Sequence, residues 1–478
     1  MFLARNAKIV LLLTLFLSAL SAAAKTKDFG EIDALIERKM KAHLIPGIAV
    51  VIVRGGEVVH SFARGSTDQG PITPDTPFLI GSLSKLFTAT LVMQLVDAGL
   101  VELDAPVVRY LPEFRTADEA GSRAITVRHL LNQNSGIPGD APRAENPDRK
   151  LQDHVAALGE TRLIAPPGGA HVYASPNYQV LGALVERVTG QEFGQRLKDS
   201  VFTPLGLTHS FTQESDAVAA GLAPGRNIWF GIAGPSAYRF EPDRLPTASI
   251  ISSARDLGHF LAAHLGGGQV GETRILSEAS ARVTHTGVAD AGAFKYAMGL
   301  RASTTAGVSS LWHGGALPNY RCAVVLLPQE NSAVVVLTNV SSIFADHPRE
   351  IAAAIVASLH GRPLPPPFRP LRQIYFGIAA ASLVLVALQI WSLLRAARAQ
   401  RPAPLLRTLL FDIALPLALV FAIPRFVGMS WRALFESAPD ISLVAILLIA
   451  IGLTTGALQL WKNKMWIAAQ QGAAAEIA

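Results

Sequence analysis

The hydrophobic positions of the chain form three patterns, and the first predicts β-hairpins near both ends of a central region. The segment IPGIAVVIVRGGEVVHSFARG (45–65) places Gly55-Gly56 between two strand-like runs. The segment CAVVLLPQENSAVVVLTN (322–339) repeats this arrangement with a turn at Gln329 to Ser332. Hairpins around a helical middle favour an α+β (mixed α/β) fold, with the N- and C-terminal strands side by side in an antiparallel sheet.

The second pattern is helical and occupies the middle of the chain. The segments SLSKLFTATLVMQLVDAG (82–99) and SPNYQVLGALVERVTG (175–190) are apolar at helical spacing and end in glycine. A glycine just past the last turn is the usual helix stop. We therefore predict helices that end at Gly99 and Gly190.

The third pattern is a series of long apolar runs at the C-terminus. Three runs with at most one charged residue each approach the length of about 20 residues that crosses hydrocarbon as a helix: Gln373–Leu394, Thr408–Pro424 and Ile441–Trp461. We predict three transmembrane helices within 373–464 and a cytoplasmic tail over 465–478. Pro416 and Pro424 weaken the middle helix, for which a buried core helix is the alternative.

The N-terminus has the layout of a secretory signal peptide. Arg5 and Lys8 precede the apolar run Ile9–Leu20, and alanines 22–24 suit cleavage, so we predict a signal peptide over 1–24. The alternative is an uncleaved membrane anchor. Both interpretations send the following residues across a membrane.

Basic residues predict the orientation in the membrane. The loop between the first two predicted spans contains Arg395, Arg398, Arg401 and Arg407 and no acid, so the positive-inside rule places it in the cytoplasm. We therefore expect a multi-pass protein of the inner (cytoplasmic) membrane. Its C-terminal helices would contact lipid, and its main domain would face the periplasm or cell exterior.

Composition explains the basic character without a nucleic-acid partner. The net charge is +6, but the excess of basic residues belongs to the two ends, and 25–370 carries one more acid than base. This excludes the electrostatic signature of nucleic-acid binding. Residues 25–362 form one compositional block, and the Pro-rich linker 363–372 follows. The single Cys322 cannot form an internal disulfide and is expected to be a buried small hydrophobe.

The first candidate for chemistry is Ser82-Leu83-Ser84-Lys85. Ser82 follows Gly81 and would open a helix, where backbone N–H groups are free. Lys85 is one turn later on the same face, so its amine can reach the Ser82 oxygen. A desolvated lysine loses its proton more easily and can act as general base to the hydroxyl. The alternative is a capping serine and a surface lysine.

Two further motifs follow in order along the chain. Tyr173-Ala174-Ser175 offers a phenol that could shuttle protons and a short polar side chain that could bind a substrate amide. His313-Gly314-Gly315 precedes the Cys322 strand, and its glycines allow close approach of backbone. The Ala316 N–H could pair with the Ser82 N–H as an oxyanion hole. The alternatives are a core tyrosine before a capping serine, and a glycine turn with a surface histidine.

Together the three motifs resemble the Ser-x-x-Lys, Tyr-x-Asn and Lys/His-x-Gly elements of the serine beta-lactamase and penicillin-binding carboxypeptidase superfamily. The segments TPFLIGSLSKLFTATLVMQLVDAGLVELDAPVVRYLPEF, TVRHLLNQNSGIPG and WHGGALPNYRCAVVLLPQENSAVVVLTN resemble its class C-like branch. The resemblance covers about residues 30 to 345. It implies an antiparallel sheet flanked by helices, a helical subdomain and a site between them.

The resemblance also implies roles for individual residues. Ser82 would be the acylated nucleophile, Lys85 its base and Tyr173 the proton carrier. His313, Gly315 and the Ala316 N–H would line the substrate-binding strand.

The chain departs from the family pattern at two of these positions. Ser175 stands where many relatives have Asn, and His313 removes the permanent positive charge of a Lys. Both departures weigh against ordinary beta-lactam turnover.

The three C-terminal helices add a resemblance to prodrug-activating peptidases of the colibactin type, which remove an N-acyl-D-asparagine cap. Ser175 and Asn319 would suit amide recognition in such an enzyme, whereas Leu79 offers no polar group to a bound amide.

We therefore predict a membrane-anchored serine hydrolase that acts on amide bonds, with small D-amino-acid-containing peptides as substrates. The alternatives are an esterase, a colibactin-type peptidase, and a non-catalytic binding or signalling domain. His259 and His264 are five residues apart, off one helix face, and no His-Glu-x-x-His motif occurs, so no metal site or cofactor is predicted.

Overall fold

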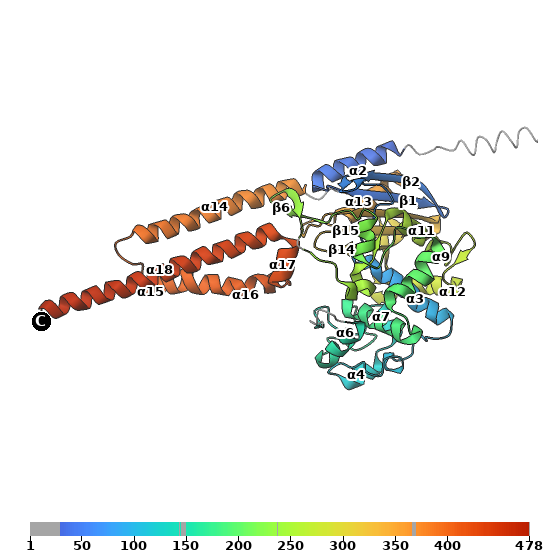
Figure 1. The fold of residues 1–478 in the computed structure, drawn as a ribbon, viewed down its shortest axis with the longest axis horizontal. Coiled ribbons are helices and arrows are strands. Elements are labelled where there is room, and N and C mark those ends of the chain that lie inside the picture. The colour runs from blue at the N-terminus through green and yellow to red at the C-terminus, as the bar shows by residue number, and fades with distance from the viewer. Residues whose placement is uncertain (1–28, 143, 145–149, 237, 366–369, 478) are drawn as a thin grey trace, which may run out of the picture.

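The computed structural model describes residues 29–142, 144, 150–236, 238–365 and 370–477. Its centre is an eight-stranded sheet in which every neighbouring pair is antiparallel (Figure 1). In spatial order the strands are β11 (Ala289–Asp290), β12 (Lys295–Tyr296), β13 (Arg301–Thr305), β14 (Val308–Ala316), β15 (Arg321–Leu327), β16 (Ser332–Thr338), β1 (Ile48–Arg54) and β2 (Glu57–Arg64). The predicted signal peptide, 1–24, lies outside the described residues.

The two predicted hairpins are confirmed, and their strands are neighbours. β1 pairs with β16, with Val51 opposite Val335. The first hairpin turns at Gly55-Gly56 as predicted. The second turns one residue earlier than predicted, because Ser332 already begins β16. Every residue of β16 is buried, which explains its continuous apolar run.

Helices cover both faces of the sheet. Their bounds are α2 (Gly30–His43), α3 (Ser84–Asp97), α4 (Glu119–Ala124), α5 (Val127–Leu131), α6 (Leu151–Ala157), α7 (Ser175–Thr189), α8 (Phe193–Leu197), α9 (Thr203–Leu205), α10 (Glu214–Ala219), α11 (Ala254–Leu265), α12 (Glu278–His285) and α13 (His347–Leu359). α2 and α13 pack on one face, where Val50 belongs to their core cluster, and α11 packs on the other, where Val51 belongs to the larger core. Successive residues of a strand point to opposite faces of the sheet, so Val50 and Val51 are buried in two different cores.

A helical subdomain containing α4 to α7 lies beyond α3, on the α11 side of the sheet (Figure 1). The predicted helix ends are confirmed: Gly99 and Gly190 both follow their helices with positive φ, 69° and 68°. Short two-stranded ribbons connect the parts. They are β3 (Ser66–Thr67) with β4 (Gly70–Pro71), β5 (Phe78–Leu79) with β8 (Ile251–Ser252), β6 (Arg226–Trp229) with β7 (Ile232–Pro235), and β9 (Gln269–Val270) with β10 (Thr273–Arg274).

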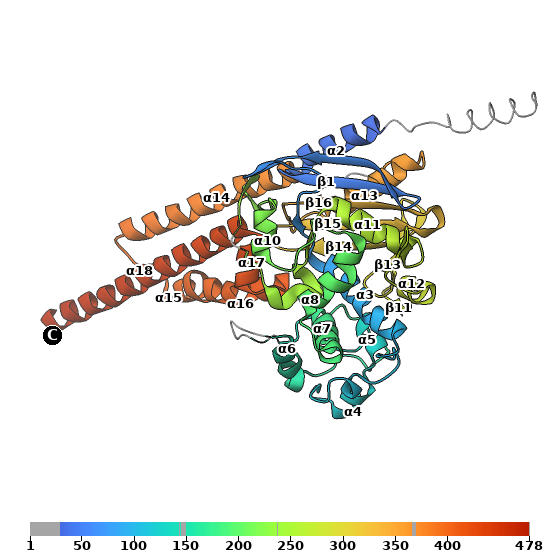
Figure 2. The same ribbon diagram turned by 45° about the vertical axis from the view of Figure 1, so that its right-hand side comes forward.

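Three helices at the C-terminus are long and apolar enough to cross a membrane, as predicted (Figure 2). They are α14 (Leu371–Arg398), the continuous helix of α15 (Leu405–Arg407), a π-helical stretch (Thr408–Ala414) and α16 (Leu415–Val427), and α18 (Pro439–Ile477). Only 11% of the most apolar part of the middle helix is buried. The alternative of a buried core helix is therefore wrong. The short α17 (Trp431–Ser437) connects α16 to α18 at the end of the three helices that lies next to the domain with the eight-stranded sheet, as both views show.

A chain of polar side chains joins α3, α11 and α12. His264 Nε2 lies 3.1 Å from Thr90 Oγ1, and His264 Nδ1 lies 3.2 Å from His285 Nε2. Burial lowers the pKa of both imidazoles, to about 4 for His285. Both rings are therefore neutral at pH 7.

This pair makes stability depend on pH. In the unfolded chain a histidine titrates near pH 6.5, so as the pH falls below that value the unfolded state takes up protons that the folded state does not. Stability is full above about pH 6.5 and falls toward pH 4. His285→Gln removes one of these groups. We therefore expect it to reduce the loss of stability between pH 7 and pH 5 by on the order of 1 kcal/mol, a value that allows for the partial exposure of the ring.

The measurement is the thermal midpoint of the full-length protein in detergent between pH 7 and 5. His259→Gln is the matched control, since His259 belongs to α11 but not to this hydrogen-bonded chain. Equal pH dependence in the wild type and His285→Gln would contradict the assignment.

Candidate active site

Ser82 lies in a tight turn before α3. Gly81–Leu83 form a 3-10 turn, so α3 begins at Ser84 and the prediction that Ser82 opens the helix is corrected by two residues. Gly81 has a φ of 53°, which glycine adopts without steric cost. The Ser84 hydroxyl donates to the Gly81 carbonyl at 2.8 Å and accepts from the Ile250 N–H at 3.2 Å. These bonds hold the turn, while Ser82 itself stays partly exposed.

Lys85 is buried directly beneath Ser82. Its Nζ lies 3.3 Å from Ser82 Oγ and 2.9 Å from the Thr247 carbonyl oxygen. Its side chain is completely buried, so the alternative of a surface lysine is wrong. The Thr88 hydroxyl donates to the Pro246 carbonyl at 2.7 Å, which fixes the segment that carries Thr247 against α3.

Tyr173 covers the lysine. Lys85 Nζ lies 5.1 Å from the centroid of its ring. The hydroxyl oxygen is shielded from solvent and makes no hydrogen bond of good geometry within the described ranges. Burial raises the pKa of the Tyr173 phenol, and the nearby Ser82 hydroxyl and Arg301 guanidinium offset part of that rise. The phenol therefore keeps its proton at neutral pH.

Gln133 positions the segment that carries Tyr173, and motif reading missed it. Its backbone adopts a left-handed φ of 59°, which is uncommon for a residue with a Cβ. Its Oε1 accepts from the Ala174 N–H at 2.9 Å and from Asn177 Nδ2 at 2.6 Å, and its carbonyl accepts from the Val172 N–H at 2.8 Å. Gln133 lies in TVRHLLNQNSGIPG, but nothing in that segment marked it individually.

Ala316 lies in the last part of β14, beyond Trp312, where the pairing with β13 has ended and that edge of the strand is free. The Leu317 N–H donates to the Tyr320 carbonyl at 2.9 Å, and hydrogen-bonded pairs alternate along antiparallel strands. Gly315 therefore bonds to β15, and the Ala316 N–H points away from β15. A Cβ on Gly81 would lie 2.8 Å from the Ala316 nitrogen, so this N–H lies beside the Ser82 turn.

Gly315 permits this close approach. A Cβ at Gly315 would overlap the Ile80 carbonyl oxygen and the Cys322 sulfur. The Cys322 thiol is buried, as predicted, and donates to the Ile80 carbonyl at 2.9 Å. The glycines thus let β14 pack against the Ser82 turn. This role comes in addition to the predicted one, which is to let a substrate approach the backbone.

His313 is an interior residue of β14. The alternative of a glycine turn with a surface histidine is wrong, because the side chain is completely buried within a strand. Its ring centroid lies 6.1 Å from that of Tyr173 and its Nε2 lies 3.5 Å from Tyr296 Oη. Burial first, and nearby cationic side chains second, lower the pKa of His313 well below 6.5. The imidazole is therefore neutral and packs behind the tyrosine.

Arg301 supplies a positive charge at this site, and motif reading missed it as well. It lies on β13 opposite Trp312. Its guanidinium carbon lies 5.5 Å from the Tyr173 ring centroid and 4.9 Å from the rings of Phe294 and Trp312. Only the strand pairing brings it near Tyr173, so no local motif could reveal it.

Comparisons with known proteins show the family of the chain. The family described as Beta-lactamase matches residues 32–358. Penicillin-binding protein 4 from Amycolatopsis lactamdurans is 32% identical over 350 residues, which span 69% of this chain and 90% of that protein. The chain belongs to the beta-lactamase family.

Further matches are one relative in sequence and two solved structures that share the fold. Protein flp from Staphylococcus aureus (strain MRSA252) is 27% identical, over 65% of this chain and 63% of its own length. A class C beta-lactamase from Rhodobacter sphaeroides superposes with a TM-score of 0.59 at 23% identity, over 69% of this chain and 98% of that one. An octameric penicillin-binding protein homologue from Pyrococcus abyssi gives 0.59 at 24% identity, over 70% and 78%.

The two remaining candidates, Ser175 and Asn319, lie on different parts of the fold. Ser175 is the first residue of α7 and is half-buried. Asn319 lies in the turn between β14 and β15, buried against Gly225, and its Oδ1 has no hydrogen-bond partner among the residues described.

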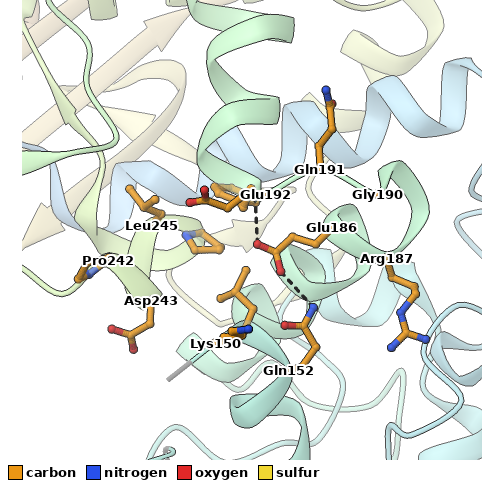
Figure 3. A pocket seen from close by; sticks show the side chains of 13 residues that line it. Lys150, Gln152, Glu186, Arg187, Gly190, Gln191, Glu192, Pro242, Asp243 and Leu245 are labelled. Atoms are coloured by element: carbon orange, nitrogen blue, oxygen red, sulfur yellow. Dashed lines mark hydrogen bonds between the residues drawn. The ribbon is translucent and has the colours of Figure 1, made fainter. Parts of the chain in front are cut away.

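A separate pocket lies between α7 and the segment 242–246 (Figure 3). It measures about 670 Å³, and Glu186 within it accepts from Gln152 Nε2 and from the Phe193 N–H, each at 3.0 Å. None of Ser82, Lys85 and Tyr173 lines it. Within the described part of the chain, no group of three or more His, Cys, Asp or Glu side chains is placed to hold a metal.

The close packing of β14 on the Ser82 turn gives a direct test. Gly315→Ala would push β14 away from Ile80, and a displacement of about 1 Å at a catalytic group costs about 100-fold in rate. We expect the rate at which a fluorophosphonate labels Ser82 to fall by about that factor.

Gly314→Ala is the matched control, because a Cβ there meets its nearest atom, the Cys322 carbonyl oxygen, at an ordinary 3.5 Å. Its labelling rate should stay close to that of the wild type. Similar rates for the two variants would show that this packing does not set the geometry of the site.

Proposed function

We propose that this beta-lactamase family protein is a membrane-anchored serine hydrolase that cleaves amide bonds through an acyl–Ser82 intermediate. The observation that carries the proposal is the buried Lys85 amine, whose Nζ lies 3.3 Å from Ser82 Oγ and 5.1 Å from the centroid of the Tyr173 ring. A nucleophile within reach of a buried amine and a protonated phenol has both a base and an acid for acyl transfer.

Each residue has a defined step in this proposal. Lys85 accepts the Ser82 proton as Oγ attacks the substrate carbonyl carbon. The N–H groups of Ser82 and Ala316 stabilise the oxyanion that forms. The Tyr173 hydroxyl donates its proton to the leaving nitrogen, and Lys85 returns a proton to Tyr173. Water then attacks the acyl–Ser82 ester while Lys85 accepts a proton from it. Lys85 returns this proton to Ser82 Oγ as the ester bond breaks, which releases the acid and restores Ser82.

Arg301 favours a leaving group that carries a carboxylate. It supplies a permanent positive charge on the Tyr173 side, where the leaving nitrogen would lie. This charge compensates for the neutral His313. A peptide with a free C-terminal carboxylate meets this requirement. The relative named Penicillin-binding protein 4, together with the resemblance to penicillin-binding carboxypeptidases, supports D-amino-acid-containing peptides as substrates.

An esterase uses the same chemistry, and no feature of the site excludes it. The three C-terminal helices favour the colibactin-type peptidase as a second candidate. Leu79 weighs against it, since this residue is buried in β5 and offers no polar group.

We further propose that the domain faces the periplasm or cell exterior. Lys462 Nζ donates to the carbonyls of Ala396, Ala397 and Ala399 at 2.7 to 2.8 Å. It therefore lies at the same end of the helices as the arginine-rich loop that follows α14. This concentration of positive charge supports a cytoplasmic position for that end.

Labelling of membranes with a fluorophosphonate or a fluorescent penicillin tests the nucleophile. We expect label on the wild type and none on Ser82→Ala. Ser309→Ala is the control, because Ser309 is an exposed serine near the start of β14, at the other end of the strand from Ala316. Unlabelled wild-type protein would refute the assignment of Ser82.

Hydrolysis of esters but not of N-acyl D-amino-acid amides would replace the peptidase proposal with the esterase.

The role of Arg301 predicts a selective change in KM. We expect Arg301→Gln to raise the KM for a D-alanyl-D-alanine-type peptide with a free carboxylate by about tenfold or more, as loss of a charge-assisted hydrogen bond implies. The C-terminal amide of the same peptide should be cleaved alike by both proteins. An equal loss for the acid and the amide would assign Arg301 a structural role instead.

A further inference from the structure

A cavity of about 900 Å³ lies between the end of the free edge of β14 and the membrane part of the chain. Ala316, Leu317 and Pro318 line it at the end of β14, and Arg432, Ala433 and Glu436 of α17 line it from the membrane part. Ala316 is also the residue whose N–H faces the Ser82 turn. The cavity therefore begins where the substrate carbonyl would lie.

Buried hydrogen bonds hold α17 in this position. Asn227 Nδ2 donates to the Pro318 carbonyl and to the Glu436 carbonyl, both at 2.8 Å, and Asn227 is almost completely buried. The Phe230 N–H donates to the buried carboxylate of Asp440, at the start of α18, at 2.8 Å. One side chain thus joins both walls of the cavity, which are more than one hundred residues apart in the sequence.

The direction of the substrate determines which of its parts enters the cavity. The leaving group lies toward Tyr173, which protonates it, and toward Arg301. The acyl group extends to the other side of the carbonyl, past Ala316 along Leu317 and Pro318. This direction rests on the function proposed above.

We propose that α17 forms one wall of the acyl-group pocket, so that the membrane part of the chain takes part in substrate selection. The lining combines apolar side chains such as Leu317 with the Arg432–Glu436 pair, whose Nε and Oε1 are 2.9 Å apart. This mixed chemistry suits an extended acyl group of the size of an acylated amino acid, with polar as well as apolar atoms. An acetyl group has a single methyl group beyond its carbonyl, so we expect it to make no contact with α17.

Filling the cavity from the α17 side tests the proposal. Ala433→Trp places a large side chain in it, and Phe435→Trp is the matched control, because Phe435 is exposed and does not line the cavity. The full-length proteins, in nanodiscs, are compared on two p-nitrophenyl esters, the acetate and an N-acyl-D-amino-acid ester. We expect Ala433→Trp to lower kcat/KM about tenfold for the extended ester, as overpacking of a filled site implies. The acetate should be unaffected, and Phe435→Trp should change neither.

Fluorophosphonate labelling at the wild-type rate shows that a variant has a folded active site. If Ala433→Trp fails this check, Ser437→Leu makes a smaller change on the same wall. Equal effects on both esters, or no effect on either, would overturn the proposal. Esters are used because they report on the acyl pocket even if no peptide is cleaved, which would refute only the peptidase function. A wild-type protein that takes no label would overturn both.

Discussion

The packing of the Ser82 turn against β14 is the contact on which the arrangement of the site depends. Gly81 and Gly315 remove the two Cβ atoms that would keep these segments apart, and the Cys322 thiol bonds to the Ile80 carbonyl from below. Protein interiors are packed closely enough that one added methyl group is felt. The sheet therefore sets the distance between Ser82 and the Ala316 N–H, because β14 cannot shift without moving β15.

Hydrophobic pattern was a good guide to the fold because strands and helices bury residues with different periods. The hairpins, the adjacency of β1 and β16, the helix ends at Gly99 and Gly190 and the three apolar helices all follow from it. The predictions from the pattern were wrong only where the local backbone geometry determines the exact bounds or type of an element. A 3-10 turn moved the start of α3 to Ser84, and the residues around His313 proved to be strand rather than a possible turn.

The candidate site was predictable only in part. Ser82, Lys85 and Tyr173 belong to motifs that carry their chemistry in local spacing, and they do lie together, although their roles stay predictions. Gln133 and Arg301 do not belong to such motifs. Gln133 acts through a left-handed backbone and an amide that bonds to another loop, and Arg301 reaches the site through strand register. Contacts of this kind arise from tertiary structure, so a single sequence does not display them.

The central position of β16 has a consequence for how the chain is made. β1 is among the first elements to leave the ribosome, but one of its two neighbours is the last strand of the domain. Almost the whole domain must be synthesised before that edge of β1 is covered. Strand pairs whose members are far apart in the sequence form late in folding. Until then, an uncovered apolar edge can pair with the wrong chain. The apolar edge of β1 therefore stays open to wrong partners until nearly the whole domain has been made.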